Sequence, residues 1–281
     1  GTFTDFLLQG QDRTPRIYKI LSSPDDPSIA VFAGLSEMAQ DLDLSLSEFI
    51  PKVRRIVHGT TVTTNAVLTG TTVKTGLLAT HGFRDALQMR RGIREELYNN
   101  KYLAPEPIVP RWLRLPVRGR VDYSGQELEP VNLNDVDEAA AKFLDEGIEA
   151  VAICFMHAYA NPDHEQAAAS RLRTLMPDAY VSVSSDILPQ VRFYERTSTT
   201  VLNAAVGPIL KHYMDQLTGR LAEVGYAGTL LIMQSNGGVC SPEAASVKAA
   251  STLLSGPAAG PVAGLAYAGK DKNFITIDMG G

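Results

Sequence analysis

The chain has 281 residues, of which 44% are hydrophobic, 20% charged and 7% aromatic. This composition is that of a globular protein, and it excludes disordered, collagen-like and fibrous classes. The net charge of -5, from 26 Lys and Arg against 31 Asp and Glu, argues against binding to nucleic acid or to an acidic membrane surface. At roughly 100–200 residues per domain, the length fits one large domain or two of ordinary size.

The two cysteines, Cys154 and Cys240, form no C-x-x-C pair and indicate no disulfide framework. A reducing compartment is the simpler interpretation, so we expect a cytoplasmic protein. The small-residue stretch 249–269 is interrupted by prolines and glycines, which argues against a membrane span.

The first part of the chain alternates strand and helix patterns. Two apolar runs separated by polar residues predict a hairpin, and a later helix is opened by threonines that can cap it. The expected elements are strands at 2–8, 16–21, 53–57 and 73–79, and helices at 27–42 and 60–68.

The periodicity is lost between residues 90 and 130, where five prolines follow the basic residues Arg90, Arg91 and Arg94. We expect a long connection with a function of its own. Regular alternation then returns, and strand, helix, strand at this spacing predicts a parallel α/β unit. The expected elements are helices at 134–146 and 162–175, strands at 150–155 and 179–184, a helical stretch at 193–224 interrupted near residue 207, a strand at 229–233, small-residue helices to 268 and a strand at 274–277.

Both chain ends carry glycine-rich acidic turns, GTFTD at residues 1–5 and DMGG at residues 278–281. Such turns offer backbone amides and hydroxyls to a phosphate, while the carboxylate can orient a metal or water. Each turn alone is more often a simple hairpin. Two of them are what a nucleotide clamp of the actin type needs, because the triphosphate lies between two hairpins.

Six segments stand in order along the chain: residues 1–5 (GTFTD), 58–66 (HGTTVTTNA), 90–98 (RRGIREELY), 235–238 (SNGG), 255–260 (SGPAAG) and 278–281 (DMGG). Together they resemble the ATP-dependent hydantoinase A and 5-oxoprolinase family, within the larger group of sugar kinases, Hsp70 and actin. The resemblance runs from the first residue to the last, and six ordered segments are more specific than any one of them.

The resemblance implies an α/β, ribonuclease H-like, actin-like ATPase fold with mixed sheets flanked by helices and an incomplete second lobe. It implies a hydantoinase A N-terminal domain at residues 1–184 and the beginning of the hydantoinase A/oxoprolinase ATPase domain at 185–281. The first phosphate motif lacks its leading Asp and first Gly, and the second lacks its T-S-x-D completion. We therefore expect the 281 residues to be a fragment, and we expect these residues alone to bind ATP weakly or not at all.

The implied activity is ATP-dependent hydrolysis of a cyclic amide such as a hydantoin, oxoproline or lactam, through phosphorylation of its carbonyl oxygen. The implied cofactors are ATP and Mg²⁺, and the implied partner is a second, hydantoinase B-like subunit. Two alternatives stay open: the nucleotide-binding subunit of an ATP-dependent ketone carboxylase, and a non-catalytic, Hsp70-like nucleotide-binding scaffold.

Candidate site residues follow from the turns and the resemblance. The catalytic candidates are Asp5, Asp278 and His58, of which Asp5 and Asp278 are also the metal candidates. The phosphate-binding candidates are Gly1, Thr2, Thr4, Gly280 and Gly281. The substrate-binding candidates are Thr60, Thr61, Asn65, Arg91 and Arg94.

Structural interpretations compete with several of these assignments. His58 could instead lie in a helix-capping loop and form a hydrogen bond with a backbone carbonyl. Arg90, Arg91 and Arg94 could belong to a solvated basic loop or face a partner subunit. The run 163–165 (DHE) resembles a metal cluster, but acidic residues in a first helical turn are the better interpretation. We expect Cys154 to be a core residue and residues 255–260 to allow close helix packing.

Overall fold

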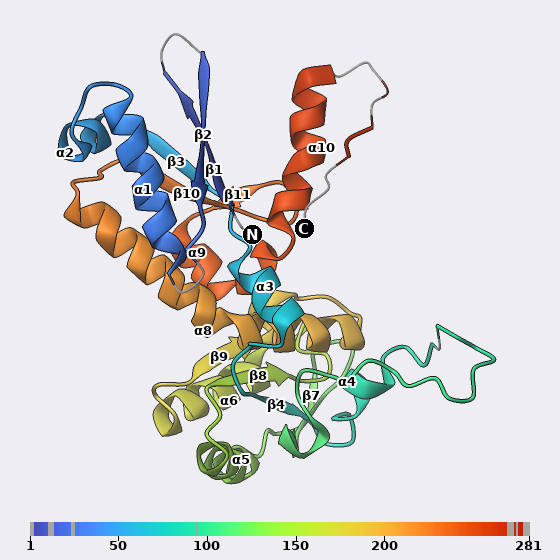
Figure 1. The fold of residues 1–281 in the computed structure, drawn as a ribbon. Coiled ribbons are helices and arrows are strands. Elements are labelled where there is room, and N and C mark those ends of the chain that lie inside the picture. Colours follow the sequence, from blue (N-terminus) through green and yellow to red (C-terminus); the bar gives the residue numbers. More distant parts are fainter. Residues whose placement is uncertain are drawn as a thin grey trace. The chain divides into compact units, whose positions relative to one another are not determined.

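The computed structural model describes residues 3–10, 14–23, 26–93, 95–268, 273 and 275–277 (Figure 1). Its contacts divide the chain into two compact units. The first unit comprises Gly1–Asn65, Leu210–Ser246 and Ser251–Gly281, and the second comprises Ala66–Ile209 and Val247–Ala250. The second unit is thus inserted in the sequence of the first. The expected domain boundary at residue 184 rests on family segments and stays a prediction.

The first unit contains an antiparallel pair, β1-β2, and a sheet of order β11-β10-β3, in which β10 is parallel to β3 and antiparallel to β11. Its strands are β1 (Phe3–Gln9), β2 (Pro15–Leu21), β3 (Arg55–His58), β10 (Thr229–Met233) and β11 (Val239–Cys240). Its helices include α1 (Pro27–Gln40), α2 (Leu46–Phe49), η1 (Ile50–Lys52), α9 (Pro242–Val247), η3 (Ala249–Thr252) and α10 (Ser255–Ala268), with α9 and η3 crossing the division.

Helix α1 begins where the sequence provides a cap. The Asp26 carboxylate accepts a hydrogen bond from the Ser28 amide at 3.0 Å, and proline occupies the first turn. At the other end, Asp41 accepts hydrogen bonds from Arg16 and Tyr18, both at 2.7 Å. Helix α1 is therefore tied to strand β2 by polar contacts.

The second unit is built on a parallel sheet of order β5-β4-β8-β9, and a separate antiparallel pair is formed by β6 and β7. Its strands are β4 (Thr75–Thr80), β5 (Arg114–Val117), β6 (Arg120–Val121), β7 (Glu127–Glu129), β8 (Ala150–Cys154) and β9 (Tyr180–Val183). Its helices are α4 (Ala86–Met89), η2 (Arg111–Leu113), α5 (Leu133–Asp145), α6 (Asp163–Leu175) and α7 (Ser184–Ile187). Helices α3 (Val62–Thr69) and α8 (Phe193–Glu223) continue from one unit into the other.

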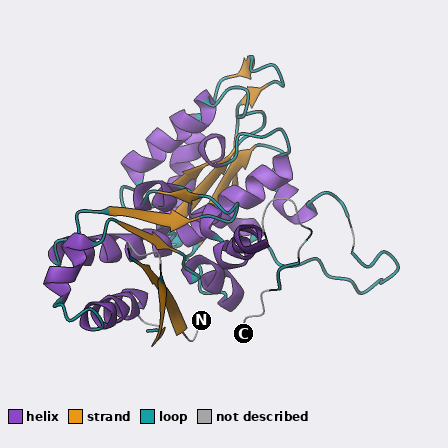
Figure 2. Ribbon diagram, turned by 90° about the horizontal axis from the view of Figure 1, so that it is seen from above, coloured by secondary structure: helices purple, strands orange, loops and turns teal. Residues whose placement is uncertain are grey.

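The core of the second unit lies around β4 and β8, which are buried along their whole length. Helices α5 and α6 cover one face of the sheet and the first half of α8 covers the other (Figures 1 and 2). A parallel sheet covered on both faces requires such continuous apolar strands. Gly76 allows close packing, because a Cβ there would lie 2.5 Å from the Phe143 ring.

The long connection after α4 has no helix or strand between residues 95 and 110. Its return to the sheet is anchored by Arg114, which is 1% exposed and donates to the Val109 carbonyl at 2.8 Å and to Gln88 at 3.2 Å. The short strands β5, β6 and β7 within the predicted connection were not expected. Their sequences are too short and too interrupted by proline and glycine to show a period.

The expected α/β fold with mixed sheets flanked by helices is confirmed. Two details differ. Helix α8 is continuous through Pro208, where an interruption was expected, because Val206 and Leu210 on either side are fully buried and hold the helix in place. Residues 275–277, expected as a strand, have no regular structure.

Among the residues described, no helix is both long enough and apolar enough to cross a membrane.

Candidate functional site

The candidate site lies in the first unit, at the carboxyl ends of the parallel strands β3 and β10. His58 is the last residue of β3 and pairs in register with Ile232 of β10. Two of the family segments lie where these strands end, residues 58–66 and 235–238. Carboxyl ends of adjacent parallel strands are the usual location of ligand sites in α/β sheets.

His58 is held by a tyrosine that no sequence motif contains. The Tyr213 hydroxyl and the His58 Nε2 atom are 2.7 Å apart, and the two rings pack with centroids 5.7 Å apart. Burial of the imidazole lowers the pKa of His58 to about 4, so the ring is neutral at pH 7. Burial also raises the pKa of Tyr213. The pair therefore offers a neutral imidazole in a fixed orientation.

The threonines after His58 organise the start of α3. Thr60 Oγ1 accepts from the Val62 amide at 3.2 Å, and Thr61 Oγ1 accepts from Asn65 Nδ2 at 3.2 Å. The Thr60 contact satisfies a backbone amide at the start of the helix, as a cap does, whereas the Thr61 contact joins two side chains one turn apart. The capping interpretation and a site role are compatible for Thr60 and Thr61, because a hydroxyl that accepts one bond can still donate another.

Two more threonines of the same motif join α3 to the segment before α10. Thr63 and Thr252 share a hydrogen bond of 3.0 Å between their hydroxyls, and Thr64 Oγ1 accepts from the Leu254 amide at 3.0 Å. Ser255 also donates to the Thr60 carbonyl at 3.3 Å. The motifs at 58–66 and 255–260, nearly 200 residues apart in sequence, are therefore in direct contact.

The turn at residues 234–238 completes the cluster. Gly237 has a φ of 79°, a conformation that favours glycine, and a Cβ there would lie 3.0 Å from Val262 of α10. The Asn236 side chain accepts from the Gly238 amide at 2.8 Å, and the Ser235 amide donates to the Ser251 carbonyl at 2.7 Å. Three of the six family segments thus lie together in one cluster.

The candidates of the first phosphate turn lie on β1. Asp5 forms an ion pair with Lys19 at 3.1 Å, and its side chain is 66% exposed. The Thr4 and Ser22 hydroxyls are 3.0 Å apart. The remaining phosphate and metal candidates lie outside the described residues: Gly1, Thr2, Asp278, Gly280 and Gly281. Within the described ranges, no group of three or more His, Cys, Asp or Glu side chains could hold a metal ion.

The basic segment belongs to the second unit and is largely paired. Arg91 forms an ion pair with Glu195 of α8, and Arg90 pairs with Glu95. Arg94 lies outside the described residues. The structure therefore places Arg91 in a different unit from His58, Thr60, Thr61 and Asn65.

The competing structural interpretations are confirmed at two further places. Helix α6 begins at Asp163, and Glu165 is fully buried and accepts hydrogen bonds from Ser184 and two backbone amides. Cys154 is fully buried in β8, and burial raises the pKa of its thiol to about 11. Neither residue has the exposure that a reactive or metal-binding group needs.

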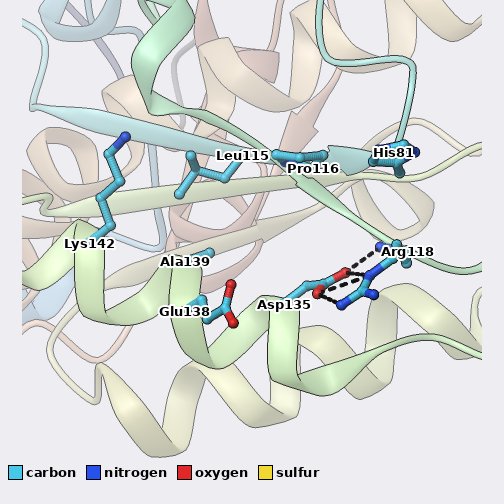
Figure 3. A pocket seen from close by; sticks show the side chains of 8 residues that line it. All are labelled: His81, Leu115, Pro116, Arg118, Asp135, Glu138, Ala139 and Lys142. Atoms are coloured by element: carbon cyan, nitrogen blue, oxygen red, sulfur yellow. Dashed lines mark hydrogen bonds and ion pairs between the residues drawn. The ribbon is translucent and has the colours of Figure 1, made fainter.

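The second unit also contains a hollow of about 440 Å³ between β5 and α5, which sequence reasoning missed (Figure 3). In it, Asp135 binds the Arg118 side chain and backbone amide, and this contact lowers the pKa of Asp135. The hollow is lined by His81, Leu115, Pro116, Arg118, Asp135, Glu138, Ala139 and Lys142. Its lining includes two carboxylates and two cations, so it favours no single ligand charge.

Two known proteins are similar in sequence to this chain over its whole length. The alpha subunit of caprolactamase from Pseudomonas jessenii is 37% identical over 286 residues, which cover the whole of this chain and 41% of that subunit. The gamma subunit of acetophenone carboxylase from Aromatoleum aromaticum is 30% identical over 300 residues, covering the whole of this chain and 40% of that subunit.

Two solved structures share the fold. The crystal structure of the ATP-dependent caprolactamase from Pseudomonas jessenii superposes with a TM-score of 0.88 at 36% identity, and the nucleotide-free acetone carboxylase with 0.86 at 25%. Each likeness covers 95% of this chain and 39% of the other chain. The chain therefore spans about two fifths of the length of these relatives.

Family models match both parts of the sequence. The hydantoinase/oxoprolinase N-terminal region matches residues 1–176, and the hydantoinase/oxoprolinase region matches residues 196–281. The resemblance expected from the six motifs is thereby confirmed, and the chain belongs to the hydantoinase/oxoprolinase family.

Proposed function

We propose that this chain is part of the nucleotide-binding subunit of an enzyme that hydrolyses a cyclic amide at the expense of ATP. The observation that carries the proposal is the convergence of three family motifs around His58 at the carboxyl ends of β3 and β10. Family membership and the likeness to an ATP-dependent caprolactamase support the same reaction class.

An unstrained cyclic amide resists hydrolysis, because its nitrogen is a poor leaving group and its carbonyl carbon is a weak electrophile. ATP, when bound, supplies a phosphoryl group that activates the carbonyl oxygen. The contribution of the protein to such a transfer is mainly positioning and stabilisation of charge.

His58 fits a role at the carbonyl oxygen. Its imidazole is neutral at pH 7. The Tyr213 hydroxyl lies 2.7 Å from its Nε2 atom and fixes the orientation of the ring. A neutral imidazole can donate a hydrogen bond to a carbonyl oxygen without adding a charge that would repel magnesium. The hydroxyls of Thr60 and Thr61 and the side chain of Asn65 are the further groups that we assign to substrate binding.

The described residues are compatible with a nucleotide and one magnesium ion. Mg²⁺ usually binds one or two carboxylates together with phosphate oxygens and water, so it needs no cluster of protein ligands. Asp5 is exposed, and its ion pair with Lys19 is the one found within the described ranges, so a metal ion could replace that lysine. We assign Asp5 and Asp278 to magnesium, and the amides of Gly1, Thr2, Thr4, Gly280 and Gly281 to the phosphates.

The proposal also covers the cellular location of the enzyme and its partner subunit. Caprolactamase alpha and the carboxylase chains are named as subunits, which supports an enzyme of more than one subunit. We propose a second, hydantoinase B-like subunit and a cytoplasmic location. Arg91 and Arg94 are assigned to substrate or to this partner.

A carboxylase of ketones is the second candidate, favoured by the fold shared with acetone carboxylase and the identity to an acetophenone carboxylase subunit. The same activation chemistry then acts on an enol oxygen or on bicarbonate. A nucleotide-binding scaffold, the third candidate, would cleave ATP without stimulation by any small substrate.

The test measures ADP release by the full-length enzyme with its partner subunit. Stimulation by a hydantoin, 5-oxoproline or a lactam supports the proposal, whereas stimulation only by a ketone with bicarbonate, or by none of these, contradicts it. Asp278→Asn is expected to abolish substrate-dependent ADP release while the protein stays folded, and Asp145→Asn, on an exposed face of α5, is the control. Unchanged turnover in Asp278→Asn would refute the magnesium assignment.

The role of His58 is tested in the same assay. His58→Gln is expected to lower kcat by about 100-fold, in the range typical for one positioned acid–base or polarising group, and Tyr213→Phe by less. His212→Gln is the matched control, because His212 is the exposed neighbour of Tyr213 on α8. Equal activity of His58→Gln and His212→Gln would exclude a site role for His58.

A further inference from the structure

The second unit has its own set of strand carboxyl ends, and the proposed function uses none of the residues there. Strand β4 ends at Thr80 and β8 at Cys154, and the two strands are adjacent and parallel. The chain after β8 turns through residues 155–161 before α6 begins. This edge is where an α/β sheet usually binds a ligand.

The turn after β8 contains His157 in a left-handed conformation, with a φ of 58°. This region is disfavoured for residues with a Cβ, although histidine is among those found there more often. The amides of Ala160 and Asn161 both donate to the His157 carbonyl, at 2.8 and 3.3 Å. His157 is therefore the residue at which the chain reverses direction in this turn.

Buried side chains hold this turn from the protein interior. The Phe155 amide donates to the Glu165 carboxylate at 2.7 Å, and the Phe155 carbonyl accepts from Arg196 at 2.7 Å. The Met156 amide donates to Thr80 Oγ1 at 2.9 Å. Glu165 and Arg196 are 0% and 1% exposed. A disfavoured conformation fixed this firmly by its surroundings is typical of functional sites.

Aromatic rings are joined to this turn through Arg196, whose guanidinium lies 5.8 Å from the Tyr159 ring and 5.6 Å from the Phe193 ring. Arg120 of β6 lies over the Phe83 ring at 5.1 Å, and Phe83 meets Phe193 edge to face at 5.9 Å. The Tyr159 hydroxyl is 3.3 Å from His157 Nδ1. We call these five residues the β8-edge cluster, and all of them are half-buried: Phe83, Arg120, His157, Tyr159 and Phe193.

Arg120 is the charged group of the cluster that has no counter-ion. Among the described residues its guanidinium makes no ion pair or hydrogen bond, only the contact with Phe83. Arg196 is matched by Glu165, 3.9 Å away. Asp122 is the other carboxylate near His157, but it accepts three hydrogen bonds from Ser124 and Gln126 in its own turn. These neutral donors leave the charge of Asp122 in place. Arg120 is therefore a cation without an ion pair among the described residues, and Asp122 is a carboxylate that would repel added negative charge near His157.

Charged groups of both signs act on His157. Burial, Arg120 and Arg196 lower the pKa of His157, and Asp122 opposes them. The imidazole is therefore neutral at neutral pH and serves as a hydrogen-bond donor or acceptor without a second charge.

We propose that the β8-edge cluster binds a small monocarboxylate with an apolar body. Arg120 presents the planar, two-pronged donor set that matches a carboxylate, and the rings of Phe83, Tyr159 and Phe193 offer apolar walls. A monoanion suits the cluster better than a phosphate dianion, because the Asp122 carboxylate near His157 repels a second negative charge. This site does not depend on the proposed function, because none of its residues belongs to the ATP or cyclic amide assignments.

The test uses benzoate as the probe and benzamide as its neutral match, with inorganic phosphate as the dianion. Binding is measured by titration calorimetry and by the NMR signals of the His157 ring. Benzoate is expected to bind in the millimolar range or tighter, at least about tenfold more tightly than benzamide or phosphate. It should also raise the pKa of His157, since a nearby anion favours the charged imidazole.

Variants separate the cluster from general charge effects. Arg120→Gln is expected to weaken benzoate binding by at least about tenfold, and Arg120→Lys to restore part of it. Arg173→Gln, an exposed arginine on α6 in the same unit, should leave it unchanged. His157→Asn keeps a residue that tolerates the left-handed conformation but removes the ring, so it should weaken binding without unfolding the turn.

The proposal is overturned if benzoate does not bind the native protein, if benzoate and benzamide bind equally, or if folded Arg120→Gln binds benzoate as the native protein does. Tighter binding of phosphate than of benzoate would also contradict it. Far-UV circular dichroism and thermal unfolding show whether each variant is folded. None of these measurements uses enzymatic turnover, so they are independent of the test of the proposed function.

Discussion

Protonation of His58 should destabilise the first unit at mildly acidic pH. In the folded protein, burial lowers the pKa of His58 from 6.5 to about 4, whereas in the unfolded chain the group keeps its ordinary value. Between these two values the unfolded state binds the proton and the folded state does not. The stabilisation is therefore fully present above the unfolded pKa and is lost as the pH falls toward the folded pKa.

The magnitude follows from the two pKa values. Each unit of pKa difference corresponds to about 1.4 kcal/mol, so the whole shift is worth about 3 kcal/mol, of which about 2 kcal/mol is lost by about pH 5. Because His58 keeps some exposure, we expect a measured loss of about 1–2 kcal/mol.

The assay compares urea unfolding of the native protein and of His58→Gln at about pH 8 and about pH 5. The native protein should lose about 1–2 kcal/mol more than the variant between the two conditions. Other titrating groups, including His157, are common to both proteins and cancel. NMR titration of the His58 ring gives the pKa directly, and His212→Gln should keep the pH dependence of the native protein.

An identical pH dependence in the native protein and in His58→Gln would refute this reasoning. A His58 ring that titrates near its ordinary value in the folded protein would do the same. Either result would mean that water reaches the imidazole, and the neutral donor assigned to the site would then be wrong.

Three further predictions concern the second unit. Gly76→Ala should destabilise it by about 1–3 kcal/mol in urea unfolding, because the new methyl group meets the Phe143 ring at 2.5 Å. Glu165→Ala should cost about 3–5 kcal/mol, because the buried Arg196 guanidinium loses its carboxylate. The Cys154 thiol, whose pKa burial raises to about 11, should resist iodoacetamide at pH 8 until the protein is unfolded, as measured by mass spectrometry.

Each of these three predictions has a control within the same chain. Gly219→Ala adds a methyl group to α8 where nothing lies within 4 Å, so it should not destabilise the protein. A similar loss in both glycine variants would contradict the packing argument. Glu138→Ala, on the exposed side of α5, should change stability far less than Glu165→Ala. Labelling of Cys154 in the folded protein at the rate of the half-buried Cys240 would show that β8 opens.

Local patterns predicted much of the secondary structure. The apolar runs of β4 and β8 and the acidic start of α6 depend on neighbours in the sequence, and the structure contains each of them. The short strands β5, β6 and β7 were missed, because two to four residues show no period. The interruption expected near Pro208 was wrong, because the stabilisation from burying the neighbouring side chains of α8 outweighs the loss of one backbone hydrogen bond.

The sequence by itself determined the family and the candidate motifs, since these depend on residue identity and order. Only the tertiary structure decided how they meet: Tyr213 reaches His58 across 155 positions, and Thr63 reaches Thr252 across 189. It also decided that Arg91 pairs with Glu195 in the second unit. The physical reason is that burial, hydrogen bonding and the resulting pKa shifts depend on groups brought together by folding, which no spacing along the chain records.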